Sequence, residues 1–287
     1  MQRPRDIYDD AYFETIDISD DYMFRSVFGE DIELCSSLLS LALGRPITDA
    51  EFVDDNHELR SHRDARAAVL DVYFVARDGT HADLEMQRAD ERNLALRIRA
   101  HLSAMDRDAV KRGDKRFRAT AETVSVFVCT FDPFGAALRR YTIRRTVQET
   151  AEPINDRQLG VVLNATGTKG DAADGLSPFL SYVSGYHGEE VMADDLVRRV
   201  DARVRAKRAD LRWRRGFVSL QESLDYRYEQ GLEQGLEQGL EQGAIEGVAA
   251  LVRDGAVTAE AAASSIGVPV EEVLRAVERA VSVPHRS

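Results

Sequence analysis

The sequence contains few cysteines and no long apolar run. Of its 287 residues, two are cysteine, Cys35 and Cys129, and each lies within an apolar segment, which is typical of reduced thiols in a protein core. No apolar stretch approaches the ~20 residues that a membrane-spanning helix needs. The charged N-terminus also lacks the apolar core of a signal peptide. These absences predict a cytoplasmic protein that does not enter a membrane.

Several motifs of catalytic and cofactor sites are also missing. The chain has no glycine-rich loop of the kind that cradles phosphate, so we expect no nucleotide cofactor, and it has no integrase-type catalytic triad. Its histidines show no metal-ligand spacing, which argues against a zinc site. They are His57, His62, His81, His101, His187 and His285.

Acidic residues outnumber basic ones, and the formal net charge is −12. This charge argues against indiscriminate coating of nucleic acid. Positive charge is nevertheless concentrated in residues 198–215 and in a smaller island at 110–118. In the longer stretch Arg203, Arg205 and Lys207 are candidate contacts to DNA phosphates, and the alternative is a solvated helix face.

The hydrophobic pattern alternates between helical and strand periods over the first half of the chain. It predicts helices in residues 18–44, a short strand near 50–59, a hairpin at 69–87, a helix over 93–113 and a buried strand at 123–131. A helix between the hairpin and the last strand allows that strand to run parallel to its neighbour. The order predicts an α/β sandwich with a mixed sheet. Further strands are expected at 140–149 and 158–167, and a short helix at 176–185.

The C-terminal third is helical in pattern and contains the repeat EQGLEQGLEQGLEQG. Leucine and glycine each recur every four residues there, so they follow adjacent stripes on a helix. Each glycine costs about 1 kcal/mol in a helix relative to alanine. The repeat is therefore either a flexible linker or a helix that a partner stabilises. We expect three parts: residues 1–192, a long helical segment at 193–247, and a tail of short helices at 248–287.

The hairpin carries acidic residues inside its pattern, and the turn around Asp78-Gly79 decides how they face. A two-residue turn would set Asp71 opposite Met86. A three-residue loop with Gly79 in the left-handed position would set Asp71 opposite Glu85, with their Cβ atoms roughly 4.5–5.5 Å apart. The sequence alone does not decide between the two registers.

In the second register two carboxylates could share one divalent cation. Oxygen ligands with room for water suit Mg²⁺ or Mn²⁺, and such an ion lowers the pKa of a bound water for hydrolysis. Gln87 lies on the same face of its strand and can orient a water but cannot act as its base. The alternative is that the carboxylates are solvated on an open face of the hairpin.

The segments DDYMFRSVFG, LDVYFVARDGTHADLEMQ, RIRAHLSAMD and VFVCTFDPFGAALRRYTI, together with the repetitive tail, are similar to those of the PD-(D/E)XK nuclease family transposases, also described as recombination-promoting nucleases. This resemblance implies a restriction-endonuclease-like αβββαβ core with a helical C-terminal extension. It implies a Mg²⁺-dependent endonuclease that hydrolyses DNA phosphodiester bonds in recombination, mobile-element or defence biology.

The resemblance also implies roles for individual residues. It assigns catalysis to Asp71, Glu85 and Gln87, with Gln87 in the place of the general lysine and Asp21 as a third metal ligand beside Asp71 and Glu85. Arg97 and Arg99 fit the pattern as phosphate contacts, and at most one of them points inward because neighbours two apart on a helix do not share a face.

The sequence departs from the family pattern at Leu70, which replaces the proline of the signature, and at Ala100 and His101, which replace two aromatic residues. The glutamine in the place of lysine keeps a second function open: a catalytically silent scaffold that binds DNA or protein. A homodimer through the C-terminal helix is expected with either function.

Overall fold

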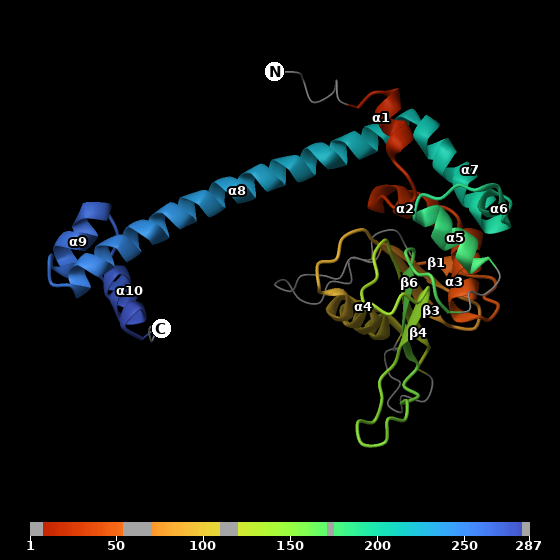
Figure 1. Cartoon of the computed structure of the whole chain (residues 1–287), viewed down its shortest axis with the longest axis horizontal. Helices are drawn as coiled ribbons and strands as arrows, with labels where there is room; N and C mark the ends of the chain where they lie inside the picture. The colour runs from red at the N-terminus through yellow and green to blue at the C-terminus, as the bar shows by residue number, and fades with distance from the viewer. Residues whose placement is uncertain (1–7, 54–70, 110–119, 171–174, 283–287) are drawn as a thin grey trace. The chain divides into compact units, whose positions relative to one another are not determined.

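The computed structural model describes residues 8–53, 71–109, 120–170 and 175–282 (Figure 1). The chain divides into two compact units on either side of Phe217. Some predictions fall outside the described residues: Leu70, most of the expected strand at 50–59, the basic island at 110–118, and His57, His62 and His285.

The described residues form an alternation of helices and strands, and the first unit contains all the strands among them. The elements are α1 (Asp10–Thr15), α2 (Asp21–Phe28), α3 (Ile32–Leu43), β1 (Glu51–Phe52), β2 (Val72–Val75), β3 (His81–Gln87), α4 (Leu94–Ala109), β4 (Thr123–Cys129), β5 (Arg140–Ile143), β6 (Gln158–Asn164), α5 (Leu176–Val183), α6 (Glu189–Met192), α7 (Asp195–Ala209), α8 (Leu211–Arg253), α9 (Ala259–Ile266) and α10 (Val270–Ser282).

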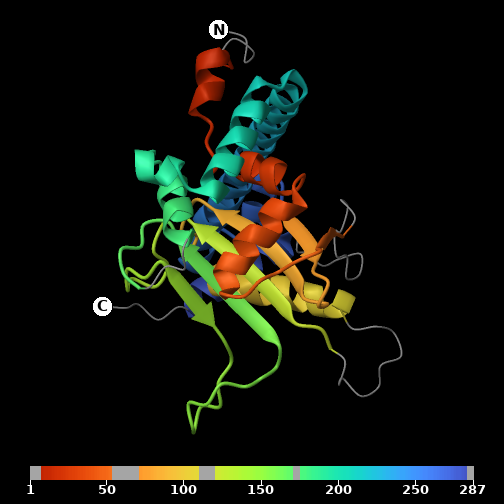
Figure 2. The same ribbon diagram turned by 90° about the vertical axis from the view of Figure 1, so that its right-hand side faces the viewer.

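Within the described residues, six strands form one mixed sheet in the order β1-β2-β3-β4-β6-β5 (Figure 2). The hairpin strands β2 and β3 are antiparallel, and β3 runs parallel to β4 across the helical crossover through α4. Strand β4 also runs parallel to β6, and β5 pairs antiparallel with β6 at the edge. The predicted mixed α/β sandwich and its parallel crossover are confirmed.

Helices cover both faces of this sheet (Figure 1). On one side lie α2, α3 and α5. Within α2 the ring centroids of Phe24 and Phe28 are 4.5 Å apart, and Phe179 of α5 meets Phe28 edge-on at 6.2 Å. On the other side α4 lays Leu94, Ile98 and further apolar residues on the sheet. Strand β3 is therefore buried on both faces.

Capping residues set the starts of the helices that flank the site. The side chain of Asp20 accepts hydrogen bonds from the backbone N–H groups of Tyr22 and Met23 at the start of α2. Asp31 does the same for Leu34 in α3, which ends at Gly44 with a left-handed φ of +67°. Both caps satisfy backbone groups that a helix end leaves unpaired.

Helix α7 belongs to the first unit, although we expected the helical extension to begin near residue 193. Its buried face, Leu196, Val197, Val200 and Val204, packs mainly on α2, α3 and α5. The expected continuous helix also breaks at Asp210, whose extended backbone and side chain cap the first turn of α8 at Arg212.

In the second unit the C-terminal end of α8 packs against α9 and α10 through Ile245 and Ala249. Thr258 caps α9 and Gly267 ends it with φ +73°. The tail expected at 248–287 begins with the end of α8 rather than with a separate short helix. The glycine-leucine repeat is helical throughout, so the flexible-linker alternative is wrong.

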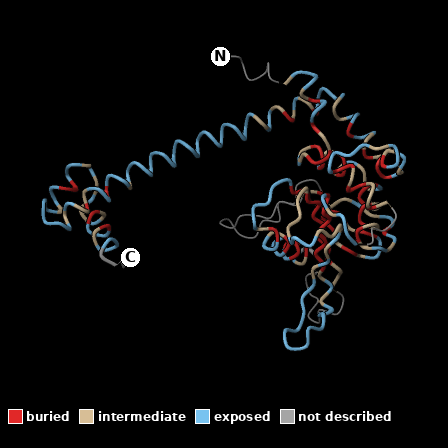
Figure 3. The backbone as a smooth tube through the Cα atoms, viewed as in Figure 1, coloured by how far each residue is buried: buried red, intermediate tan, exposed pale blue. Residues whose placement is uncertain are grey.

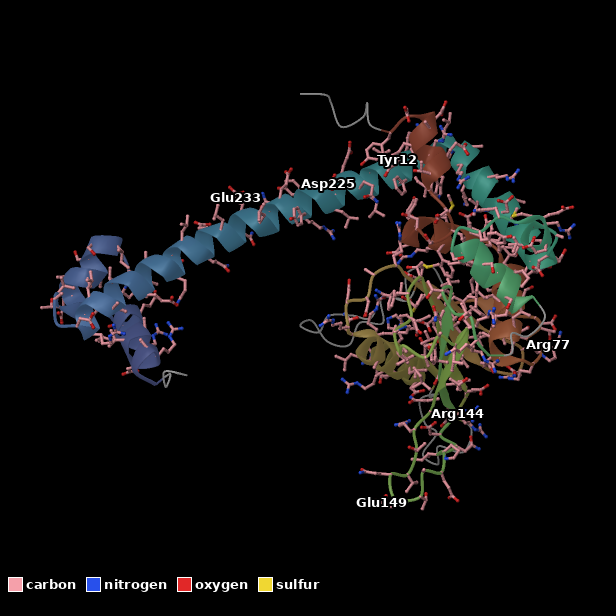
Figure 4. The ribbon with its side chains drawn as sticks, in the orientation of Figure 1. Tyr12, Arg77, Arg144, Glu149, Asp225 and Glu233 are labelled. Carbon is pink, nitrogen blue, oxygen red and sulfur yellow. The ribbon has the colours of Figure 1, made fainter. Side chains whose placement is uncertain are left out.

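The repeat portion of α8 is exposed on all sides within the described residues (Figure 3). Leu232, Leu236 and Leu240 are each more than 60% exposed, and Asp225 and Glu233 extend into solvent from the same helix (Figure 4). None of the helices in the described ranges has both the length and the apolar character that crossing a bilayer requires.

Candidate active site

The hairpin adopts the three-residue loop that sets Asp71 opposite Glu85. The N–H of Ala76 donates to the carbonyl of Thr80 at 2.9 Å, and Gly79 has φ +86°. The paired residues Val72 and Leu84 begin the ladder. Just outside it, the backbone N–H of Asp71 donates to Oε1 of Glu85 at 2.7 Å. The register that brings the two acidic residues together is confirmed.

The acidic face of the hairpin is buried beneath α4. Asp83 is fully buried, and Glu85 and Gln87 are 1% and 6% exposed. The alternative of solvated carboxylates on an open face is therefore wrong for β3. The sequence did not reveal this because the hairpin pattern alone does not show which face a later helix covers.

Helix α4 supplies two polar side chains to this buried face, Arg97 and His101, one helical turn apart. Nδ1 of His101 lies 2.7 Å from Oδ2 of Asp83 and 3.4 Å from Oε1 of Glu85. An Nη2 nitrogen of Arg97 lies 3.2 Å from Oε2 of Glu85. Glu85 is thus held between an imidazole on one side and a guanidinium on the other.

Burial raises the pKa of both strand carboxyls. The pKa of Glu85 lies well above its ordinary value because burial disfavours its charge and because Asp71 and Asp83 add negative charge nearby. The pKa of Asp83 is also raised by burial, against the opposing effect of its hydrogen bond with His101. Charge on this face therefore has to be balanced by a cation, by a bound proton, or by both.

The carboxylate of Asp71 is held by α2. Its Oδ1 forms an ion pair with the guanidinium of Arg25, which is half exposed. Burial opposes the charge of Arg25, but attraction to Asp71 raises its pKa overall. Asp21 lies one turn earlier on α2, and burial together with the charge of Asp71 raises the pKa of Asp21 to about 6. The structure therefore brings the third predicted ligand close to Asp71.

The amide of Gln87 is engaged at both ends. Its Oε1 accepts a hydrogen bond from Arg97, and its Nε2 donates to the carbonyl of Ala89 at 2.8 Å. Arg99 is exposed on the opposite side of α4, so the expectation that at most one of the two arginines points inward is confirmed. Arg97 places a permanent positive charge beside both Glu85 and Gln87.

Three residues of the site were not assigned by the sequence: Arg25, Asp83 and His101. Asp83 lies two residues before Glu85 on β3 and so shares its face of the strand, but the sequence assigned it no role. His101 was set aside because its sequence neighbours offer no metal-ligand spacing, and that reasoning failed because its partners lie on β3. The sequence did contain one indication of their location. Arg25 follows Asp21 by four residues and His101 follows Arg97 by four, so each pair lies on one face of its helix.

The basic stretch on α7 lies apart from this cluster, and its candidate residues are paired within the fold. Arg203 pairs with Asp31 at 2.8 Å, Arg205 with Asp201 at 2.7 Å, and Lys207 with Glu30 at 2.5 Å. A role for the three cations in DNA binding stays a prediction, and it requires these ion pairs to open.

The family model of the PD-(D/E)XK nuclease family transposases matches residues 18–152. This range begins before α2 and extends past β5, so it includes each of the side chains described around Asp71 and Glu85. No curated protein and no solved structure matches the chain. The sheet with its helical crossover, the paired acids of the hairpin and the family match agree: residues 18–152, a little under half of the chain, are similar to the PD-(D/E)XK nuclease family transposases.

Proposed function

We propose that this protein is a metal-dependent DNA endonuclease that hydrolyses phosphodiester bonds in recombination, mobile-element or defence biology. The observation that carries the proposal is the hairpin register, in which the backbone of Asp71 binds the carboxylate of Glu85 at 2.7 Å. Two acidic residues at the corresponding positions are the signature that the family resemblance associates with phosphodiester cleavage.

The residues present fit a divalent cation. Asp71, Glu85 and Asp21 offer carboxylate oxygens, and burial together with the charge of Asp71 raises the pKa of Asp21, as expected where acidic groups crowd without a cation. An all-oxygen donor set suits Mg²⁺ or Mn²⁺. Such an ion supplies a bound water of lowered pKa and polarises a phosphoryl oxygen.

The chain's own cations support the same reaction. Arg97 lies against Glu85 and Gln87 and supplies the positive charge that lysine carries in the general signature. Gln87 cannot take a proton from water because an amide is not basic, so its role is to position Arg97. Arg25 is half exposed beside Asp71 and can turn to a DNA phosphate when a cation takes over the charge of Asp71.

A second function, a catalytically silent scaffold that binds DNA or protein, is favoured by one observation. Arg25 and Arg97 already compensate the two signature acids, and the amide of Gln87 is fully engaged. Because its charges are already compensated without a metal ion, the site can stay folded in a protein that does not cleave DNA. Cleavage activity distinguishes the two functions.

The deciding experiment measures nicking of supercoiled plasmid with Mg²⁺ or Mn²⁺ against the same reaction in EDTA. We expect Asp71→Asn and Glu85→Gln each to abolish metal-dependent nicking, because each removes one oxygen ligand. Asp78→Asn is the matched control, since Asp78 lies in the loop of the same hairpin and pairs with Arg45. Its activity should equal that of the wild type.

The two site variants should remain folded, since Glu85→Gln removes a costly buried charge and Asp71→Asn leaves a half-exposed arginine. Thermal unfolding in EDTA checks this point. Nicking that survives both substitutions at wild-type rates would reject the site, and a wild type without metal-dependent nicking would favour the silent scaffold.

A further inference from the structure

Beside the Asp71–Glu85 pair lies a second cluster, formed by Asp83, Glu85 and His101. One ligand atom from each residue lies within 4.8 Å of the others, and all three residues are buried. Two members come from β3, and the imidazole comes from α4. Asp71 is not part of this group, and we call the side of Glu85 that faces Asp83 and His101 its inner side.

The charges around Glu85 differ between its two sides. On the outer side Arg25 pairs with Asp71 and Arg97 pairs with Oε2 of Glu85. On the inner side Oδ2 of Asp83 and Oε1 of Glu85 both lie near Nδ1 of His101, and this Oε1 also accepts the hydrogen bond from the backbone N–H of Asp71. Two carboxylates therefore share one imidazole in a buried place, where an uncompensated charge is costly.

An independent observation also indicates a missing partner in this cluster. Among the described residues, the buried side-chain atoms without a hydrogen-bond partner are Oδ1 of Asp83 and Oγ of Ser125. Ser125 on β4 is the register partner of Asp83, and both side chains lie on the face that α4 covers. The Ser125 hydroxyl acts to lower the pKa of Asp83 and so lies next to it, but neither oxygen makes a hydrogen bond of normal geometry. Buried polar atoms normally have partners, and a ligand at this position would supply them.

We propose that Asp83, Glu85 and His101 form an inner cation site that prefers a first-row transition ion such as Mn²⁺ or Zn²⁺ to Mg²⁺. Imidazole nitrogen suits transition ions, whereas Mg²⁺ prefers an all-oxygen shell. The inner site shares Glu85 with the proposed nuclease site and rests on that proposal only through this shared carboxylate.

The separations between donor atoms agree with such an ion. Ligands about 2.1 Å from a metal lie about 3.0 Å apart at a right angle and about 3.4 Å apart in a tetrahedron. The separations from His101 Nδ1, 2.7 Å to Asp83 and 3.4 Å to Glu85, are close to this range. Small side-chain rotations would bring the three donor atoms to the separations that an ion requires.

Mn²⁺ is the probe, because it reports both stoichiometry and ligand identity with the full-length protein. Calorimetry should give two Mn²⁺ per chain, and pulsed electron paramagnetic resonance should show coupling to an imidazole nitrogen. In His101→Gln the nitrogen coupling should vanish and one Mn²⁺ should be lost or bound at least about 10-fold more weakly. Excess Mg²⁺ should displace the outer ion and leave the nitrogen-coupled one.

Two further variants separate this proposal from the nuclease proposal. Asp71→Asn should lose the outer Mn²⁺ but keep the nitrogen coupling. His187→Gln is the control, since His187 is exposed and lies outside the cluster, and it should bind like the wild type. Asp83→Asn should lose the nitrogen-coupled ion if His101→Gln does not fold, which thermal unfolding in EDTA will show.

Mn²⁺ bound without nitrogen coupling in the wild type, or unchanged binding in both His101→Gln and Asp83→Asn, would overturn the inner site. Loss of nicking in Asp71→Asn would then still support the nuclease. Conversely, nitrogen-coupled Mn²⁺ in a protein that never nicks DNA would support the inner site and reject the nuclease.

Discussion

At the scale of single residues, Arg97 is the side chain on which the chemistry of the site depends most after the two acids. It contacts Glu85 and Gln87 at once and lies over the ring of Phe127 at 5.5 Å. A guanidinium stays charged at every physiological pH.

We expect Arg97→Ala to lower plasmid nicking by at least about 100-fold, the size of effect that removal of one preorganised charge interaction produces. Arg97→Lys should keep part of the activity because it retains the charge. Arg99→Ala, on the exposed side of the same helix, is the matched control and should nick at the wild-type rate. Equal losses in the Arg97→Ala and Arg99→Ala variants would contradict a local role for Arg97.

Gln87 should matter less than Arg97. Gln87→Ala removes one hydrogen bond to Arg97 and should lower nicking modestly, whereas Gln87→Lys restores the residue of the general signature and should preserve or raise it. Single-turnover cleavage measures the difference. Abolition of activity by Gln87→Ala alone would assign the amide a larger part than positioning.

Asp21 gives the site a pH dependence. Because its pKa is raised on folding from 3.8 to about 6, the folded protein binds its proton more tightly than the unfolded chain does. Ionisation of Asp21 therefore costs stability as pH rises from about 4 to above 6, and the cost is absent at lower pH. Solvent screening limits it to less than about 1 kcal/mol.

Asp21→Asn should raise the free energy of unfolding in EDTA at pH values above the pKa of Asp21, and the gain should disappear near pH 4. Urea unfolding at several pH values measures it, with Asp9→Asn as a control that removes another helix-start acid. A gain that is independent of pH would mean that the ionisation of Asp21 is not its source.

At the scale of elements, the sequence was sufficient to predict the hairpin but not to predict which helix covers it. Gly79 and the alternation of Asp71, Tyr73 and Val75 define two possible registers, and the structure adopts the one with a left-handed glycine. The burial of Glu85 beneath α4 depends on where a helix that begins only at Leu94 packs. That is a tertiary property, and no periodicity within the hairpin encodes it.

Helix α7 also shows that tertiary contacts cannot be read from local sequence, here because the fold neutralises charges that the sequence left unpaired. Its basic residues suggested a free cationic surface, but carboxylates distant in sequence pair with them: Asp31 lies 172 residues before Arg203. Local charge patterns reveal i,i+4 partners such as Asp201 and Arg205. They do not reveal partners that the fold brings from elsewhere.

The predicted DNA-binding role of α7 is testable in spite of these pairs. Replacing Arg203, Arg205 and Lys207 together by glutamine should weaken DNA binding on all sequences and reduce the slope of log affinity against log salt, by about 0.9 for each phosphate that the protein no longer neutralises. Asp31→Asn keeps the cap of α3 but frees Arg203, so it should strengthen binding. An unchanged slope in both variants would mean that these three cations stabilise the fold and do not contact DNA phosphates.

At the scale of the whole molecule, α8 carries an unusual surface. Its glycines from Gly231 to Gly243 have open space where a Cβ would project, and its repeat leucines are exposed. A helix with this many glycines is weak in isolation. A second copy of the chain would bury the leucine stripe and let the backbones approach closely along the glycines.

We therefore expect the protein to dimerise through α8, as measured by sedimentation velocity. Deleting residues 230–287 should give a monomer, and so should replacing Leu232, Leu236 and Leu240 by glutamine, which preserves helix propensity. Leu251→Gln, at another exposed leucine of α8 outside the repeat, is the control and should stay dimeric. A full-length monomer would mean that the repeat forms a helix without a partner.

The position of β4 has a consequence for when the candidate site can first form. The charged side chains of the site lie within residues 21–101, yet two of them pack against Phe127 of β4. The ring centroid of Phe127 lies 5.5 Å from Cζ of Arg97 and 5.3 Å from the ring centroid of His101. Strand β3 also lacks one of its two neighbours until β4 is in place. A nascent chain therefore carries every reactive group before it can hold them in order. Translation therefore delays the assembly of the candidate site until the middle of the sheet has left the ribosome.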